Sequence, residues 1–265
     1  MPENKQPEWL ADATFYEIYP QSFQDTNADG IGDIPGIIKR LDYIKELGCN
    51  AIWLNPCFLS PFGDAGYDVE DYYTVAPRYG TNEDLAHLFE EAHKRDMHVI
   101  LDLVPGHTAV THKWFKESMK AKKNEYTDRY VWTDCIWEEP QGMNCIRGIS
   151  DRDGSCAVNF FSHQPALNYG FYTQERDWQQ PQDAPGPQAT LEAMKDVMRF
   201  WLTMGCDGFR VDMAGSLVKN DPDSKGTIKL WQNVREFLNA EFPKAAPSAP
   251  PAWKIHISAC LNANH

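Results

Sequence analysis

The sequence predicts an α/β fold in which a parallel sheet is covered by helices. Short apolar runs rich in strand-forming residues occur at 14–19, 50–55 and 98–104, and helical patterns separate them. Strands and helices that alternate along the chain in this way form parallel βαβ units. The 265 residues are enough to bury a substantial core.

Two helical patterns lie between these strands. In 34–47 the apolar residues follow the three-and-four spacing of one buried helix face, and Gly48 ends the pattern. Thr81 and Asp84 have the spacing of a capping box, so we predict that the second helix begins there. Each helix would cover the sheet with its apolar face.

The regular pattern is interrupted after the third strand and then resumes. From about 107 to 168, Trp, Asn, Gly, Cys and charged residues are mixed without periodicity, which predicts an irregular inserted subdomain. A helix with its apolar face over 191–201, a strand over 206–212 and a helix over 228–238 then follow.

The residues after this last helix lack the pattern of a central strand. Residues 244–252 contain three prolines, which have no amide to donate to a sheet ladder. Only 253–258 has strand character, and no Asp or Glu follows Glu241. We therefore expect the regular architecture to stop near Phe242, before a tail such as a frameshift or premature stop would produce.

Charge and aromatic content restrict the class of partner. The chain has 25 Lys and Arg against 38 Asp and Glu, a net charge of -13. Nucleic acids and anionic membrane surfaces both require a cationic face, so we expect neither as a partner. Aromatic residues make up 12% of the chain, which is compatible with a neutral ligand such as a sugar stacked on rings.

The N-terminus and the cysteines indicate a cytoplasmic protein. Residues 1–7 lack the basic and apolar regions of a signal peptide, and no apolar run is long enough to cross a bilayer. The seven cysteines are odd in number and scattered, so we expect free thiols. Zinc binding by Cys135, Cys145 and Cys156 is an alternative that their spacing disfavours.

A candidate metal loop follows the first strand. Its residues run Asp-Thr-Asn-Ala-Asp-Gly-Ile-Gly-Asp over 25–33, with oxygen side chains at alternate positions and a glycine at the sharp turn. The alternative interpretation is a turn rich in Asx residues. We predict Ca²⁺ in this loop, with Mg²⁺ as a possible substitute. The predicted ligands are Asp25, Asn27, Asp29 and Asp33 through their side chains and Ile31 through its carbonyl.

Candidate catalytic residues lie at the end of the fourth strand. Arg210 and Asp212 are two residues apart, so their side chains point to the same face. An arginine beside a carboxylate favours its ionised form, as a nucleophile requires. The pentapeptide Gly-Phe-Arg-Val-Asp alone fits a structural Arg–Asp pair equally well.

Six segments occur in the order and at the spacing of a known family. They are Phe15–Pro20, Ile52–Pro56, Gly66–Tyr72, Asp102–His107, Gln164–Asn168 and Gly208–Asp212. Together they resemble motifs of the α-amylase family, glycoside hydrolase family 13, and the last resembles its nucleophile motif. The resemblance covers about 9–242 and is nearest to oligo-1,6-glucosidases and related α-glucosidases.

This resemblance implies a (β/α)8 TIM-type barrel, truncated in this chain after about four β/α units. Residues 1–107 would form the first part of the barrel and 108–168 the inserted subdomain B. Residues 169–242 would continue the barrel, and 243–265 would be a tail foreign to the family. Because an eight-stranded barrel cannot close with four strands, we expect exposed strand edges.

The resemblance also assigns roles to individual residues. Asp212 would be the nucleophile of a retaining mechanism that forms a covalent glycosyl-enzyme, and Arg210 would keep it ionised. The remaining residues would form the sugar pocket: His107 bonding hydroxyls, Tyr67 stacking under the ring, Asp68 contacting its far hydroxyl, and Asp102 acting structurally behind them.

The predicted function is that of a retaining α-glycosidase acting on α-1,4- or α-1,6-linked gluco-oligosaccharides. In the family, the general acid is a Glu at the end of strand five, and no such residue follows Glu241. We therefore expect this chain alone not to hydrolyse a nitrophenyl α-glucoside. Alternatives are a non-catalytic sugar-binding or assembly partner and a transglycosylase such as trehalose synthase; the oligomeric state stays open.

Overall fold

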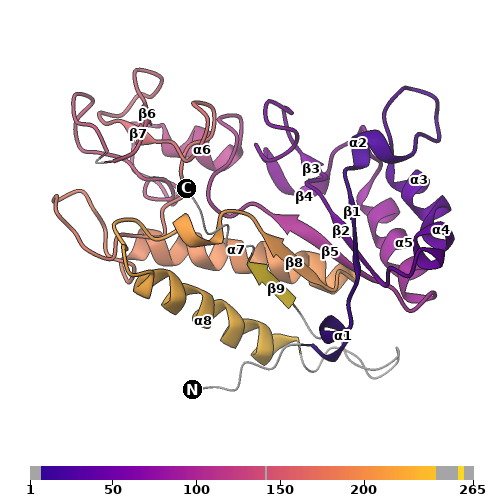
Figure 1. Ribbon diagram of the computed structural model, residues 1–265. Helices are drawn as coiled ribbons and strands as arrows, with labels where there is room; N and C mark the ends of the chain where they lie inside the picture. Colours follow the sequence, from indigo (N-terminus) through magenta and orange to yellow (C-terminus); the bar gives the residue numbers. More distant parts are fainter. Residues whose placement is uncertain (1–6, 141, 243–255, 260–265) are drawn as a thin grey trace.

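The computed structural model describes residues 7–140, 142–242 and 256–259. Its main sheet is parallel, with strands in the order β1-β2-β5-β8-β9 (Figure 1). These strands are β1 (Phe15–Ile18), β2 (Ala51–Leu54), β5 (His98–Leu103), β8 (Gly208–Val211) and β9 (His256–Ala259). The spatial order follows the chain order, so the predicted parallel α/β architecture is confirmed.

Helices pack on this sheet and close the core. The larger ones are α3 (Ile34–Lys39), α4 (Leu41–Glu46), α5 (Asn82–His93), α7 (Pro185–Met204) and α8 (Lys225–Glu241). Ile52, Val99 and Leu101 on the central strands are buried among apolar side chains from these helices. Each such side chain stabilises the fold by about 1.5–3 kcal/mol relative to exposure. The strands are therefore rigid supports for the residues at their carboxyl ends.

The segment predicted as one helix over 34–47 forms two short helices. Arg40 has φ -107° and ψ 4°, outside the α region, and separates α3 from α4. The Arg40 side chain contacts the segment before α3, where its Nε donates to Gln24 Oε1 at 2.8 Å. The apolar spacing did not reveal this break, because the buried face continues across it, with Ile37 before Arg40 and Leu41 after it.

The predicted capping box of α5 is confirmed. The Asp84 amide donates to Thr81 Oγ1 at 3.2 Å, and the Thr81 amide donates to the Asp84 carboxylate at 2.8 Å. These two bonds satisfy amides that have no partner within the helix, which fixes where α5 begins.

The long connection between β5 and α7 is mostly irregular. It contains α6 (Lys113–Ser118) and the two-residue strands β6 (Cys145–Ile146) and β7 (Cys156–Ala157). In Figure 1 it lies beyond the carboxyl ends of the main strands. The smaller elements elsewhere are α1 (Glu8–Ala11), α2 (Pro20–Phe23), β3 (Phe58–Leu59), β4 (Asp71–Val75) and the 3₁₀ turn η1 (Ala214–Ser216). The domain boundaries stay predictions.

The expectation that regular structure stops near Phe242 is wrong in one respect. Strand β9 extends the sheet and pairs in parallel with β8, with His256 opposite Gly208. Residues 256–259 contain no proline, so every residue can offer its amide to the ladder. The proline-rich residues 244–252 lie outside the described part of the chain, as does most of the predicted tail.

Two observations concern membranes and cysteines. Among the described residues, no helix is long and apolar enough to cross a bilayer. The six cysteines in those residues are free thiols, and Cys260 lies outside them. No group of metal-binding side chains is present in the described ranges, so nothing there supports the zinc alternative.

Candidate active site

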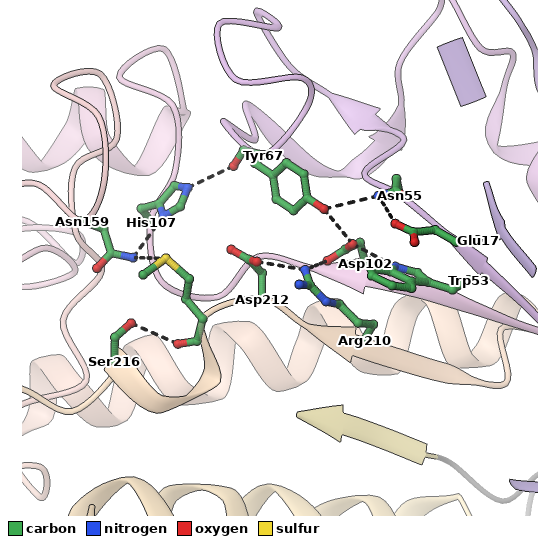
Figure 2. A network of polar contacts seen from close by, with 11 residues as sticks. Glu17, Trp53, Asn55, Tyr67, Asp102, His107, Asn159, Arg210, Asp212 and Ser216 are labelled. Atoms are coloured by element: carbon green, nitrogen blue, oxygen red, sulfur yellow. Dashed lines mark hydrogen bonds and ion pairs between the residues drawn. The ribbon is translucent and has the colours of Figure 1, made fainter. Parts of the chain in front are cut away.

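Asp212 and Arg210 lie together at the carboxyl end of β8. The Asp212 amide donates to the Leu103 carbonyl of β5 at 2.8 Å, which fixes its position beyond the strand. Arg210 Nη1 donates to Asp212 Oδ1 at 2.8 Å and to Asp102 Oδ1 at 3.0 Å (Figure 2). Asp102 is the register partner of Arg210 in the β5–β8 pair. The sheet register therefore brings two carboxylates to one guanidinium.

Asp102 is buried and uses both carboxylate oxygens within the protein. Its Oδ2 accepts from Trp53 Nε1 at 2.9 Å and from the Tyr67 hydroxyl at 3.2 Å. The Arg210 guanidinium also lies over the Trp53 ring, 4.9 Å from its centroid. Asp102 thus links Arg210 to Tyr67, and its side chain is 0% exposed, so it offers no surface to a ligand. The structural role expected of Asp102 from the sequence stays a prediction.

Burial changes the ionisation of this cluster more than the arginine does. Removal from water raises the pKa of Asp102 to about 6, although Arg210 opposes the shift. Burial also raises the pKa of Asp212 above its ordinary value, and the negative charge of Asp64 adds to that effect. Burial alone would lower the pKa of Arg210, but its two carboxylate partners outweigh this and raise it.

The expectation that Arg210 would lower the pKa of Asp212 therefore needs correction. Arg210 does act in that direction, but the loss of hydration is larger. A desolvated carboxylate is less well stabilised than one in water, which is a usual property of a group prepared for nucleophilic attack. The same arginine is also shared with Asp102, which divides its stabilising effect.

Tyr67 lies above this network and contacts it at two points. Its hydroxyl donates to Asp102, and Asn55 Nδ2 donates to the hydroxyl at 3.4 Å. The hydroxyl points toward Asn55 and Asp102, while the ring lies above Asp212 in Figure 2. Burial raises the pKa of Tyr67, so it stays protonated near neutrality.

His107 is buried, with protein partners on both ring nitrogens. Nε2 donates to the Tyr67 carbonyl at 3.1 Å, and Asn159 Nδ2 donates to Nδ1 at 3.2 Å. Burial lowers the pKa of His107 to about 4, so the ring is neutral at pH 7. To bond a sugar hydroxyl, as predicted from the sequence, His107 would have to exchange one of these partners.

Asp68 and Asp64 differ in a way that the sequence did not reveal. The Asp68 side chain is 0% exposed and accepts from the Ser60 hydroxyl and from the amides of Gly63 and Asp64. It shapes the turn and offers no surface to a hydroxyl. Asp64 is partly exposed, and its charge acts on Asp212. The geometry therefore favours Asp64 over the predicted Asp68 as a ligand contact.

Several contacts of the site were not predicted from the sequence. Trp53 orients Asp102, Asn159 orients His107, and Gln164 Nε2 donates to Asp64 Oδ2 at 2.6 Å. No sequence signal marked Trp53, because β2 is apolar throughout and the partial exposure of Trp53 appears only in the structure. Asn159 and Gln164 belong to the irregular connection, where no periodicity indicates direction.

The predicted metal loop does not gather its carboxylates around one point. Asp25 accepts from the amides of Asn27, Ala28 and Gly30, and Asp33 accepts from Thr26 and Gly36. In the described residues no three His, Cys, Asp or Glu side chains form a metal-binding group. The local hydrogen bonds explain this, because each carboxylate turns toward nearby amides. The donor set itself still consists of the hard oxygen ligands that Ca²⁺ prefers.

Comparison with protein families gives one match over most of the chain. Residues 17–246 match the family described as "Alpha amylase, catalytic domain". This range includes the cluster around Arg210 and Asp212, the loop at 25–33 and the long irregular connection.

Characterised proteins and solved structures agree with this match. A trehalose synthase/amylase from Mycolicibacterium smegmatis is 38% identical over 252 residues, covering 89% of this chain and 39% of the relative. An oligo-1,6-glucosidase from Bacillus sp. (strain F5) is 39% identical over 219 residues, covering 80% and 40%. The crystal structure of trehalose-6-phosphate hydrolase from Bacillus licheniformis has a TM-score of 0.69 and 37% identity, covering 88% and 42%. The chain spans about two fifths of the length of these relatives.

Proposed function

The chain belongs to the α-amylase catalytic-domain family, and from this premise we propose that Asp212 is the nucleophile of a retaining reaction on α-glucosides. The observation that carries the proposal is the asymmetry of its carboxylate. Arg210 holds Oδ1, whereas Oδ2 has no partner among the described residues. A carboxylate held by one oxygen presents the other in a fixed direction, as a nucleophile requires.

In the proposed step, Oδ2 of Asp212 attacks the anomeric carbon of a bound α-glucoside. A covalent bond forms between them, the glycosidic C–O bond breaks, and its electron pair leaves with the aglycone oxygen. Water or a second sugar hydroxyl then attacks the same carbon and releases Asp212. Tyr67 supports the sugar from above the carboxylate, and Asp64 accepts from one of its hydroxyls.

The first step needs a proton for the departing oxygen. A retaining enzyme supplies it from a second carboxyl group about 5 Å from the nucleophile. Asp102 does not fit this role, because its side chain is 0% exposed and both its oxygens accept from protein groups, so it cannot reach the departing oxygen. No acidic residue follows Glu241 in the sequence. We propose that these 265 residues supply the nucleophile but not the acid.

A substrate that needs no acid tests the nucleophile separately. In 5-fluoro-α-glucosyl fluoride, fluoride departs without protonation and the ring fluorine slows hydrolysis of the covalent intermediate. We expect mass spectrometry to detect one fluoroglucosyl group, located on Asp212 by peptide mapping. Asp212→Asn should not be labelled, and Asp102→Asn should retain some labelling. Labelling of another residue, or none in a folded chain, would contradict the proposal.

Transglycosylation is a second candidate, favoured by the similarity to a trehalose synthase/amylase. Both reactions share the proposed covalent intermediate and differ only in the acceptor. In a longer protein that also contains the general acid, product analysis with maltose distinguishes them: glucose alone indicates hydrolysis, whereas a new disaccharide indicates transfer. The acceptor site would have to lie beyond Asp212, where Asn159 Nδ2 of the irregular connection contacts Met213 Sδ at 3.8 Å.

We also propose that the loop at 25–33 binds Ca²⁺, or Mg²⁺ in its place. Asp25, Asn27, Asp29 and Asp33 offer side-chain oxygens, and Ile31 offers its carbonyl. A carboxylate oxygen that accepts an amide still has a lone pair for a cation. The cation would stabilise the loop that leads into α3. The free thiols support the further proposal of a reducing, cytoplasmic location.

A further inference from the structure

A large cleft lies away from the catalytic cluster, between β4 and α6. Its volume is about 570 Å³, and its walls include Tyr73, Trp114 and Tyr126. This volume falls within the range of about 300–1,000 Å³ found for small-molecule sites. Asp212, Arg210 and the other members of the proposed catalytic set do not line it.

Strand β4 separates this cleft from the catalytic side. Tyr72 is buried, and its hydroxyl donates toward the carbonyls of Val104 and His107, beside the catalytic residues. Asp71 and Tyr73, its neighbours in sequence, line the cleft instead. Because successive strand residues point to opposite faces, the cleft and the catalytic cluster lie on opposite faces of β4.

Polar groups without protein partners converge on the cleft. Thr111 Oγ1 is buried and has no hydrogen bond in the described part of the chain. His112 Nδ1 accepts from the Trp114 amide, and burial lowers the pKa of His112 to about 3, so Nε2 carries a proton. Within the described ranges, no protein group accepts from His112 Nε2 or from the Trp114 indole N–H. The two N–H groups are not among the buried atoms, so they are accessible and can donate to a ligand or water in the cleft, whereas Thr111 Oγ1 is closed off from it.

The charges around the cleft favour a neutral ligand. Among the lining residues, Glu70, Asp71 and Glu117 face the cations Lys113 and Lys116, and Glu117 is also paired with Lys120. The charges therefore nearly cancel. Such a lining does not attract phosphate or another anion. Rings beside unpartnered donors and carboxylate acceptors instead suit a molecule with an apolar face and many hydroxyl groups.

We propose that this cleft is a second, non-catalytic binding site for an α-linked gluco-oligosaccharide. The apolar face of a sugar ring would pack on Trp114 or Tyr126, while its hydroxyls bond His112 Nε2 and the Glu70 carboxylate. The proposal goes beyond the catalytic function and does not require it. A site here would hold a glucan on the same molecule without occupying the nucleophile.

Titration calorimetry with maltotriose tests the proposal on the full chain carrying Tyr67→Ala, which removes the sugar contact at the catalytic cluster. We expect saturable binding in this background. Adding Trp114→Ala or Glu70→Ala should weaken it by about tenfold or more, as loss of a stacked ring or of a charged hydrogen bond does. Trp137→Ala is the matched control, because Trp137 is 85% exposed and lies outside the cleft.

Glu70→Ala keeps the test valid if Trp114→Ala does not fold, since the Glu70 carboxylate has no partner in the described residues. Absence of binding in the Tyr67→Ala background, or equal affinity in Glu70→Ala, would overturn the proposal. Binding that Tyr67→Ala abolishes and Glu70→Ala leaves intact would support the catalytic site alone. Inorganic phosphate that competes with maltotriose would show that the cleft selects anions, which would also overturn it.

Discussion

One guanidinium nitrogen of Arg210 lies 2.8 Å from Asp212 Oδ1, and the same nitrogen lies 3.0 Å from Asp102. The proposed nucleophile and a buried structural carboxylate therefore share one positive charge. Any change to one of the carboxylates alters the balance at the other, so the three residues behave as one electrostatic unit.

Arg210→Met should destabilise the fold and abolish labelling of Asp212 by the glucosyl fluoride. Removing the cation leaves two buried carboxylates close together, and breaking a buried pair costs about 3–5 kcal/mol. Urea unfolding at pH 7 measures this loss. Lys39→Met, an exposed cation on α3, is the control and should change the free energy of unfolding by less than about 0.5 kcal/mol.

The pH dependence of stability should show a contribution from Asp102. Burial raises its pKa from 3.8 to about 6, so the folded state holds a proton that the unfolded state releases in this range. Its stabilising contribution is thus complete below pH 4 and lost as the pH rises through 6. The loss is on the order of 3 kcal/mol. His107 has the opposite effect, because its pKa is lowered from 6.5 to about 4 in the folded state. Its contribution to the free energy of unfolding is therefore lost as the pH falls through 4.

The two contributions are separated by comparing urea midpoints of the wild-type chain and Asp102→Asn from pH 4 to 7. The variant should lack the decline that Asp102 causes and retain the acid-side loss from His107. Parallel profiles for the two proteins would show that Asp102 is already ionised throughout this range.

The parallel α/β framework could be predicted from the sequence because its signals are local and periodic. The apolar run at 98–104 and the Thr81–Asp84 capping box each determine an element without reference to distant residues. The break at Arg40 could not be predicted, since the helix face continues across it.

The catalytic cluster was predictable only in part. Arg210 and Asp212 were recognisable as a pair on one strand, whereas the sharing of Arg210 with Asp102 depends on the β5–β8 register. The raised pKa of Asp212 depends on burial, which sequence spacing does not report. Asp64 and Asp68 lie in one loop, and only its folded path decides which carboxylate is buried.

Calcium should stabilise the wild-type chain more than an Asp25→Asn variant. A ligand that binds only the folded state adds about 2.7 kcal/mol when present at 100 times its dissociation constant. Because Asp25 also accepts three local amides, the variant should unfold earlier even without calcium. The test is therefore the increment in thermal midpoint on adding CaCl₂. Equal increments in both proteins would place any calcium elsewhere.

The 265-residue chain should react with the fluorinated glucosyl fluoride, so that Asp212 becomes covalently labelled, but it should not hydrolyse maltose. Departure of fluoride needs no proton, whereas the sugar alkoxide leaving from maltose does. Azide or formate can replace a missing acid or base from solution. The rate of sugar release in the presence of either anion is therefore a further measurement, and we expect it to exceed the rate without the anion. Glucose release from maltose that Asp212→Asn abolishes would show that another residue of this chain donates the proton.

Asp64→Asn and Asp68→Asn should separate ligand contact from loop structure. Asp64 acts on Asp212 through its charge, so its removal should lower the pKa of Asp212 and slow labelling while leaving unfolding nearly unchanged. Asp68 is buried with three donors, so Asp68→Asn should cost about 1–3 kcal/mol of stability. Carboxyl ¹³C NMR titration measures the first effect and urea unfolding the second. If Asp68→Asn instead slows labelling at full stability, the original assignment of Asp68 as the sugar contact is correct.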